Sequence, residues 1–310
     1  MTQAYQATQI LQITDTTDRN AELKILGAYT KHKGLNGIHG DVVVKPASDT
    51  LDIGAAVSEM VTNKERPERL IIAVNSAPPD KKEGTEGNAR RGFYFADLGN
   101  GVTVGGTSNG LEFSYIRPLV KELYELTTTN SRGSQFRSLE ILPEASLQFA
   151  NPDKRAELIA NGTLKKVNPD SVIPSVPQKT HVIEVDNFRN AKLWVTKADH
   201  AKLKKAAKKK ENVRVTFARY SVELLAAKLI NRPELKKGKN LKPFKAKATP
   251  TLFEAPLGTN LIALSSSSRR VDGVDVPIIA TIREHPAKTK PRYPVPSVGT
   301  AVKLVFKPQR

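Results

Sequence analysis

Short apolar segments alternate with longer helix-forming segments through the first half of the chain, and this alternation limits the possible folds more than any other feature. Five segments have the length and apolar content of buried strands: residues 10–14, 40–46, 69–74, 92–98 and 102–106. Four others have helical character: residues 20–32, 52–63, 111–126 and 152–161. Strands that alternate with helices pair largely in parallel, so the sequence predicts an α/β domain whose central, mostly parallel sheet is covered by helices on both faces.

The second half of the chain has a different character. The stretch "NPDSVIPSVPQKT" (168–180) interrupts the alternation with three prolines, which is typical of a link between domains. From His181 onward, short β-rich segments follow one another: 181–188, 191–196, 212–220, 260–268, 276–283 and 301–307. We therefore predict an α/β domain at 1–165, a linker at 166–180 and a smaller antiparallel β-barrel domain at 181–310.

Composition excludes several kinds of site. The chain has no cysteine, which excludes disulfides, thiolate metal sites and cysteine nucleophiles. The five histidines are scattered without metal-ligand spacing, so no metal site is predicted. No apolar run has the length of a membrane span, and the polar start "MTQAYQATQ" lacks the regions of a signal peptide. We expect a cytoplasmic protein without a membrane partner.

The net charge of +18 raises the question of a nucleic-acid partner. The basic residues concentrate in "KADHAKLKKAAKKKENVR" (197–214) and "RPELKKGKNLKPFKAKA" (232–248). The first segment alternates lysine with alanine and leucine at helical spacing, which predicts a helix with a solvated lysine face. The second is interrupted by Pro and Gly and predicts an exposed insertion. Charge alone supports only nonspecific attraction, and no RNA-binding aromatic motif or zinc finger is present, so a nucleic-acid partner is not expected.

A carboxylate follows the first predicted strand directly, in "LQITDTTDRN" (11–20). In an open α/β sheet, ligands bind at the carboxyl ends of the strands, and a carboxylate there can accept hydrogen bonds from sugar hydroxyls. The alternative is that Asp15 or Thr16 only caps the following helix.

Neither a P-loop nor a dinucleotide-binding glycine fingerprint is present, because "GNGVTVGG" lies between strand-like segments and opens no helix. Short blocks elsewhere match one family in their order and separation: "ITD" (13–15), "DTLDIGAAVSEMV" (49–61), "LIIAVNSAPPDKKEGTEGNARRGFYF" (70–95), "TSNGLEFSYI" (107–116), "FRSLEILPEASLQFA" (136–150), "VIEVDNFRNAKLWVT" (182–196) and "LIALSSSSRR" (261–270). Through this series the chain resembles the S-adenosyl-L-methionine (SAM) hydrolase and halogenase family, which includes SAM hydroxide adenosyltransferase, fluorinase and chlorinase.

The resemblance implies attack of water, hydroxide or halide on the ribose C5′ of SAM, with methionine as the leaving group. SAM is then the substrate, and no cofactor or metal is implied. Asp15 falls where the family holds the ribose hydroxyls, and this match favours a ligand role over the helix cap. Where the hydrolases carry an Asp, the loop offers Asn75, Ser76 or Ala77, and Asp80 matches only with an insertion. We assign Asn75 to substrate binding, and the family arginine matches either Arg90 or Arg91.

The Asp-Arg-His set that the hydrolases use for water is incomplete in this sequence. Arg137 stands at the His position, and a guanidinium stays protonated near neutral pH, so it cannot act as the general base. Ser138 matches the serine that fluoride-using halogenases place beside the anion; the alternative is an ordinary loop serine. We assign Arg90, Arg137 and Ser138 to the catalytic set.

The resemblance also implies a binding role for residues of the second domain. Asp186 matches the ligand of the methionine ammonium, Phe188 the residue that packs on adenine and Asn190 the residue that bonds its edge. Ser268 and Arg269 match the ligands of the methionine carboxylate, within about one residue of register. The alternatives are a surface ion pair for Asp186 and a core aromatic for Phe188.

The expected function is cleavage of SAM to adenosine and methionine. The family further implies a homotrimer in which each site lies between one subunit's first domain and a neighbour's second. A halide-using adenosyltransferase, or a SAM- or adenosine-binding protein without turnover, is the alternative. A nucleic-acid-binding protein is the less favoured reading.

Overall fold

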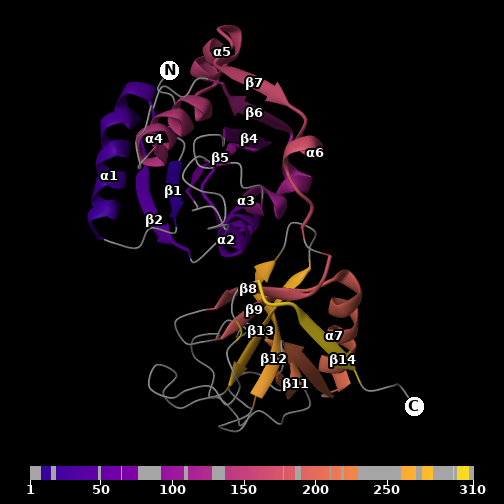
Figure 1. The fold of residues 1–310 in the computed structure, drawn as a ribbon. Coiled ribbons are helices and arrows are strands. Elements are labelled where there is room, and N and C mark those ends of the chain that lie inside the picture. The colour runs from indigo at the N-terminus through magenta and orange to yellow at the C-terminus, as the bar shows by residue number, and fades with distance from the viewer. Residues whose placement is uncertain are drawn as a thin grey trace, which may run out of the picture. The chain divides into compact units, whose positions relative to one another are not determined.

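The structure is a computed structural model that describes residues 8–14, 19–47, 50–63, 65–75, 92–107, 111–127, 137–176, 178–185, 190–209, 211–217, 220–229, 260–269, 274–281, 296 and 299–306. The chain divides into two units, Met1–Val176 and Pro177–Arg310, shown in Figure 1. The division lies inside the stretch 166–180 that the sequence predicts as a linker. Part of that stretch is regular structure of the first unit.

The first unit is built on a seven-stranded sheet with the order β2-β1-β3-β5-β4-β6-β7. Its strands are β1 (Thr8–Thr14), β2 (Asp41–Pro46), β3 (Arg69–Asn75), β4 (Phe93–Gly99), β5 (Val102–Thr107), β6 (Glu122–Leu126) and β7 (Leu164–Val167). The strands β2, β1, β3 and β5 pair in parallel, and β4, β6 and β7 continue the sheet in antiparallel fashion. The predicted α/β architecture is confirmed.

Helices cover both faces of the parallel part of this sheet. The helices of the first unit are α1 (Arg19–Lys33), α2 (Thr50–Thr62), α3 (Leu111–Ser114), α4 (Arg137–Ala150), α5 (Pro152–Ala160) and α6 (Pro169–Val172), with short 3₁₀ turns at Gly34–Asn36 and Arg117–Leu119. α1 and α4 pack together and share one core cluster with Ile10 of β1 and Ile71 of β3. Because strand side chains alternate between faces, Leu11 and Ile13 point to the other side, where they are buried and where α2 packs on β1.

The predicted helix at 111–126 is wrong. The structure divides this segment into α3, the 3₁₀ turn at Arg117–Leu119 and strand β6. Pro118 lies within the 3₁₀ turn and cannot donate the hydrogen bond that a continuing helix needs. β6 instead pairs with β4 on one side and β7 on the other, so tertiary pairing decides its conformation.

The second unit also contains a seven-stranded sheet, with the order β14-β10-β11-β12-β13-β9-β8. Its elements are β8 (His181–Val185), β9 (Ala191–Trp194), α7 (Lys197–Lys209), β10 (Asn212–Phe217), β11 (Tyr220–Leu229), β12 (Asn260–Arg269), β13 (Asp275–Thr281) and β14 (Val302–Phe306). All pairs are antiparallel except β11 with β12, which is parallel. The sheet is therefore antiparallel apart from the parallel pair of β11 and β12, which the sequence did not predict.

The two outer strands of this second sheet are also joined to each other. His181 of β8 forms a bridge with Ala301, the residue before β14. Around it, the Val182 amide donates to the Thr300 carbonyl over 3.0 Å, and the Val302 amide donates to the Thr180 carbonyl over 2.8 Å. Backbone groups that an open sheet would leave exposed at its edges are paired here.

No helix among the described residues is long and apolar enough to cross a membrane.

Candidate functional site at the carboxyl edge of the first sheet

The order of the parallel strands defines a position where ligands can enter. The chain leaves β1 through α1 to β2 on one side, and returns through α2 to β3 on the other side of β1. Consecutive crossovers thus run in opposite directions around β1. In open α/β sheets such a reversal opens a crevice at the carboxyl ends of the two strands, which here are β1 and β3.

Thr14 and Asn75 are the last residues of these two strands and lie opposite each other in the sheet. The Asn75 side-chain amide (Nδ2) donates to the Thr14 hydroxyl over 3.4 Å. Thr14 is fully buried, and its carbonyl accepts the amide of Ala47 over 2.8 Å. Asn75 is half-buried, so part of it is exposed at the carboxyl end of β3.

Both side chains belong to the sheet face that α1 and α4 cover. Ile71 and Ala73 of β3 pack in the α1–α4 core cluster, and Asn75 continues the same alternation. On β1, Ile10 packs in that cluster and Gln12 accepts a 2.8 Å hydrogen bond from the Tyr29 hydroxyl of α1. Thr14 therefore shares this face.

The first turn of α4 lies near the same edge. At the other end of the helix, the Arg69 guanidinium (Nη2) donates to the Ala150 carbonyl over 2.6 Å, so α4 ends where β3 begins. In between, a Cβ at Gly105 of β5 would lie 3.0 Å from the Ser146 hydroxyl. Eight residues of helix lead from Ser146 back to Ser138, a rise of about 12 Å, which brings Ser138 to the level of the strand ends or slightly beyond.

Other helices of the first unit begin at the same edge. α2 follows the carboxyl end of β2, and α3 follows that of β5. Within α3, Glu112 is fully buried, and the Ser114 hydroxyl donates to the Pro174 carbonyl over 2.7 Å. No sequence motif singled out Thr14 or Glu112; for Thr14 the available signal was a hydroxyl residue that closes a buried strand directly before Asp15.

The pair Thr14 and Asn75 offers neutral donors and acceptors at this edge. The described residues contain no group of three or more His, Cys, Asp or Glu side chains that could hold a metal ion. Beneath the edge, burial raises the pKa of the Tyr29 hydroxyl, so it stays protonated and donates to Gln12 at every physiological pH. Hydroxyl and amide groups suit a polar, uncharged ligand part such as a sugar.

Several predicted site residues lie outside the described residues: Asp15, Arg90, Arg91, Asp186 and Phe188. Arg137 begins α4, and Ser268 and Arg269 end β12, with only their backbone described. Ser138 is half-buried and lies in the first turn of α4 instead of a loop.

The structure relates these residues to different parts of the fold. Asn75 ends β3 at the carboxyl edge of the first sheet, and α4, which packs on β3 and β5, begins with Arg137 and Ser138. In the second unit, Arg269 pairs with Asp275 at one end of β13, whereas Asn190 directly precedes Ala191, which pairs with Ile279 near the other end. At about 3.4 Å per residue, Asn190 and Arg269 lie well over 10 Å apart along the sheet.

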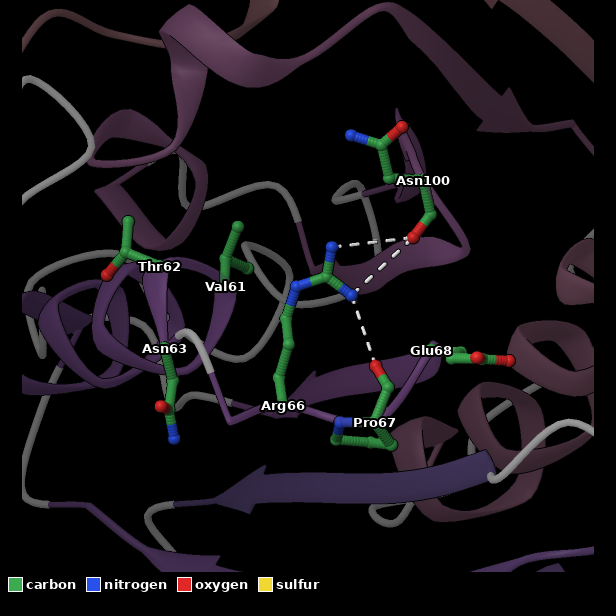
Figure 2. A pocket seen from close by; sticks show the side chains of 7 residues that line it. All are labelled: Val61, Thr62, Asn63, Arg66, Pro67, Glu68 and Asn100. Carbon is green, nitrogen blue, oxygen red and sulfur yellow. Dashed lines mark hydrogen bonds between the residues drawn. The ribbon is translucent and has the colours of Figure 1, made fainter.

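A shallow pocket lies at the opposite, amino edge of the first sheet (Figure 2). It is lined by the end of α2 and the residues around the start of β3: Val61, Thr62, Asn63, Arg66, Pro67, Glu68 and Asn100. The Arg66 guanidinium donates to the carbonyl of Pro67 over 3.1 Å and to that of Asn100 over 3.5 Å. The Arg66 side chain thus links the segment before β3 to the turn that contains Asn100. None of the predicted site residues lines this pocket.

Comparison with known proteins supports the fold. No protein-family model and no curated protein matches the chain. Among solved structures, an uncharacterized conserved protein from Thermotoga maritima matches with a TM-score of 0.61 and 12% identity. A conserved hypothetical protein from Thermus thermophilus matches with a TM-score of 0.57 and 14% identity. Each match covers 96% of this chain and 100% of the other, so the similarity extends over both units.

Proposed function

We propose that this protein binds SAM at the carboxyl edge of the first sheet and cleaves it at the ribose C5′ with water or hydroxide, giving adenosine and methionine. One observation carries the proposal. Thr14 and Asn75 come from distant parts of the chain, yet they are hydrogen-bonded at one strand reversal of the sheet, and α4 packs on the strands β3 and β5 beside it. The same three parts contain the family-like blocks around Asp15, Asn75 and Arg137-Ser138.

In the proposed reaction, the oxygen of water forms a bond to C5′ while the bond from C5′ to the sulfonium sulfur breaks. The electron pair of that bond stays on the methionine sulfur, and the proton of the water passes to solvent. The leaving group is already good, so the protein acts mainly by positioning the ribose and the nucleophile in line. Asp15, directly after Thr14, accepts hydrogen bonds from the two ribose hydroxyls.

A halide-using reaction is the second candidate, and the position of Ser138 favours it. Ser138 lies in the first turn of α4, where backbone N–H groups have no partner within the helix and the helix dipole favours an anion. Arg137, the first residue of α4, adds a positive charge to the same turn. A protein that binds SAM without turnover would share the ribose contacts but lack both reactions.

The roles proposed for residues of the second unit rest only on the resemblance to the SAM hydrolase and halogenase family. We propose that Asp186, Phe188, Asn190, Ser268 and Arg269 bind adenine and methionine, and that the protein is a cytoplasmic homotrimer. We also propose that the second sheet closes into a β-barrel, which the hydrogen bonds between Val182, Thr300, Thr180 and Val302 support.

The test is to incubate the protein with SAM in water, with and without fluoride or chloride, and to separate the nucleosides by chromatography. We expect adenosine at a low rate, because the loss of a general base typically lowers a rate about 10²- to 10⁴-fold. A 5′-halogenated nucleoside would establish the second candidate. SAM binding without any product would leave the protein as a binding protein, and failure to bind SAM would overturn the proposal.

A further inference from the structure

The positive charge of the chain belongs entirely to the second unit. Residues 177–310 contain 29 of the 49 Lys and Arg residues but only 10 of the 31 Asp and Glu residues, a net charge of +19. Residues 1–176 contain 20 basic and 21 acidic residues, a net charge of −1. A general need for solubility would not place the whole surplus on one unit, so the charge calls for a specific account.

Helix α7 presents part of this charge in an ordered form. Its inner face, Leu203, Ala206 and Ala207, is buried in the core of the second unit. Its outer face carries six exposed lysines, which we call the α7 lysine face: Lys197, Lys202, Lys204, Lys205, Lys208 and Lys209. At 100° per residue these lysines all lie on the side opposite Leu203, with only Ala198 and Ala201 between them.

The single acidic residue of α7 faces the body of the protein. The Asp199 carboxylate accepts a 2.6 Å hydrogen bond from the Thr180 hydroxyl, and its amide bonds the Thr196 hydroxyl over 3.0 Å at the start of the helix. Asp199 therefore fixes the first turn of α7 and leaves the outer face without a carboxylate of its own.

Neighbouring carboxylates do little to neutralise the α7 lysine face. Within the described part of the chain, Lys209 is the one member with a carboxylate within 4 Å, that of Glu211 at 3.8 Å. Lys202 lies over the Phe306 ring at 5.8 Å. Lys204 with Lys208, and Lys205 with Lys209, are like charges one helical turn apart, which destabilise a helix slightly. Solvating faces usually intersperse both signs of charge, and this one does not.

We propose that the α7 lysine face binds the phosphate backbone of nucleic acid, an activity beyond the proposed SAM chemistry. The helix is about 19 Å long, and a duplex presents one phosphate charge per about 1.7 Å of its axis, so several ammonium groups can contact phosphates at once. Contacts to phosphates fix the position of a protein on nucleic acid but carry no sequence information, so the proposed binding is independent of sequence.

An anionic membrane suits this face less well. A helix that binds a membrane surface inserts large apolar side chains between the lipids. The apolar residue of α7 larger than alanine is Leu203, and it is buried in the protein core. The outer face has only alanine to insert, so phosphates in an extended nucleic-acid chain fit it better.

The experiment measures binding of the full chain to a fluorescent DNA duplex of about 20 base pairs, by anisotropy, between about 50 and 200 mM salt. The test variant changes Lys204, Lys205, Lys208 and Lys209 to Gln, which keeps good helix propensity. A matched control changes four exposed lysines of the first unit to Gln, Lys24, Lys31, Lys121 and Lys165. A second control changes the four α7 lysines to Arg, which keeps their charge.

We expect the α7 Gln variant to bind the duplex at least about tenfold more weakly and to lose up to about 3.6 units of the log–log salt slope, because each of four phosphate contacts contributes about 0.9. The first-unit control and the Arg variant should bind like the unaltered protein, and SAM turnover should be unchanged in all of them. Equal losses in the α7 and first-unit variants would overturn the proposal in favour of net charge alone. Binding to phosphatidylserine vesicles but not to the duplex would overturn it in favour of a membrane.

Discussion

The side-chain amide of Asn75 donates to the hydroxyl of Thr14 over 3.4 Å, and this bond joins the last residues of β1 and β3 at the strand reversal of the first sheet. Two variants separate a structural from a ligand role. Thr14→Val and Asn75→Ala both remove the bond, but only Asn75→Ala removes the amide from the crevice. We expect Asn75→Ala to weaken SAM binding about tenfold more than Thr14→Val, since hydrogen bonds to bound groups are worth about 0.5–1.5 kcal/mol or more. Equal affinities by calorimetry would restrict Asn75 to a structural role.

Ser138 gives a prediction about anions. If a halide is held at the first turn of α4, Ser138→Ala should reduce the halide response of SAM turnover about tenfold or more, because a hydrogen bond to a charged group contributes about 1.5–3 kcal/mol. Rates are measured at increasing fluoride and chloride. The control is Ser171→Ala on the short helix α6, whose hydroxyl bonds the Asn168 carbonyl. A halide response that is the same in both variants would exclude Ser138 from anion binding.

Arg137 gives a prediction about water. Arg137→His supplies the imidazole that the hydrolases use, so it should raise adenosine formation if an acidic residue is close enough to orient it. The rate should then depend on pH near 6.5, the ordinary pKa of histidine. An unchanged rate with a flat pH profile would mean that position 137 takes no part in handling water.

Tyr29 gives a prediction about stability at high pH. Burial raises the pKa of its hydroxyl above the ordinary value of about 10. Above about pH 10 the unfolded chain loses this proton and the folded chain keeps it. The contribution of Tyr29 to the free energy of unfolding is therefore complete below about pH 10 and falls by about 1.4 kcal/mol for each further pH unit. Denaturation of the protein and of Tyr29→Phe between about pH 9 and 11 isolates this effect. Parallel pH dependence in the two proteins would contradict it.

The same variant tests the hydrogen bond between Tyr29 and Gln12. Below pH 10, Tyr29→Phe should lower the free energy of unfolding by about 1 kcal/mol, because it leaves the Gln12 carbonyl without its donor.

Closure of the second sheet is tested by hydrogen exchange. The amides of Val182 and Val302 bond the carbonyls of Thr300 and Thr180. In a closed barrel these amides should exchange as slowly as those of the interior strands β11 and β12, because no edge is free to fray. Exchange at the rate of an exposed edge strand would show that the sheet opens between β8 and β14.

The sequence predicted most elements of the first unit because its apolar segments are long and clearly periodic, as in β1, β3 and α2. It failed where tertiary contacts decide. The pattern of β6 predicts a helix, and only its pairing with β4 makes it a strand. Likewise, β11 contains the helix-forming residues "ELLAAKL" but is a strand because it pairs with β10 and β12 on either side. No segment around α4 was predicted, because Pro143 interrupts its pattern although the helix continues through it.

The candidate site was predictable only in part. "ITD" after an apolar run indicated a ligand-binding strand end, which the strand reversal beside β1 supports. The pairing of Thr14 with Asn75 depends on the register between two strands about sixty residues apart, which no local pattern contains. The approach of Ser138 to the same edge depends on the direction in which α4 crosses the sheet.

The central claim, that SAM binds at the carboxyl edge of the first sheet, is tested most directly by calorimetric titration of SAM into Asp15→Ala. The matched control is Asn63→Ala, in the pocket at the opposite edge. The account predicts that Asp15→Ala weakens binding by about ten- to hundredfold, the loss of about 1.5–3 kcal/mol, while the control binds normally and both variants stay folded. Unchanged affinity of Asp15→Ala together with a lowered melting temperature would contradict the account and leave Asp15 with a structural role in the segment before α1.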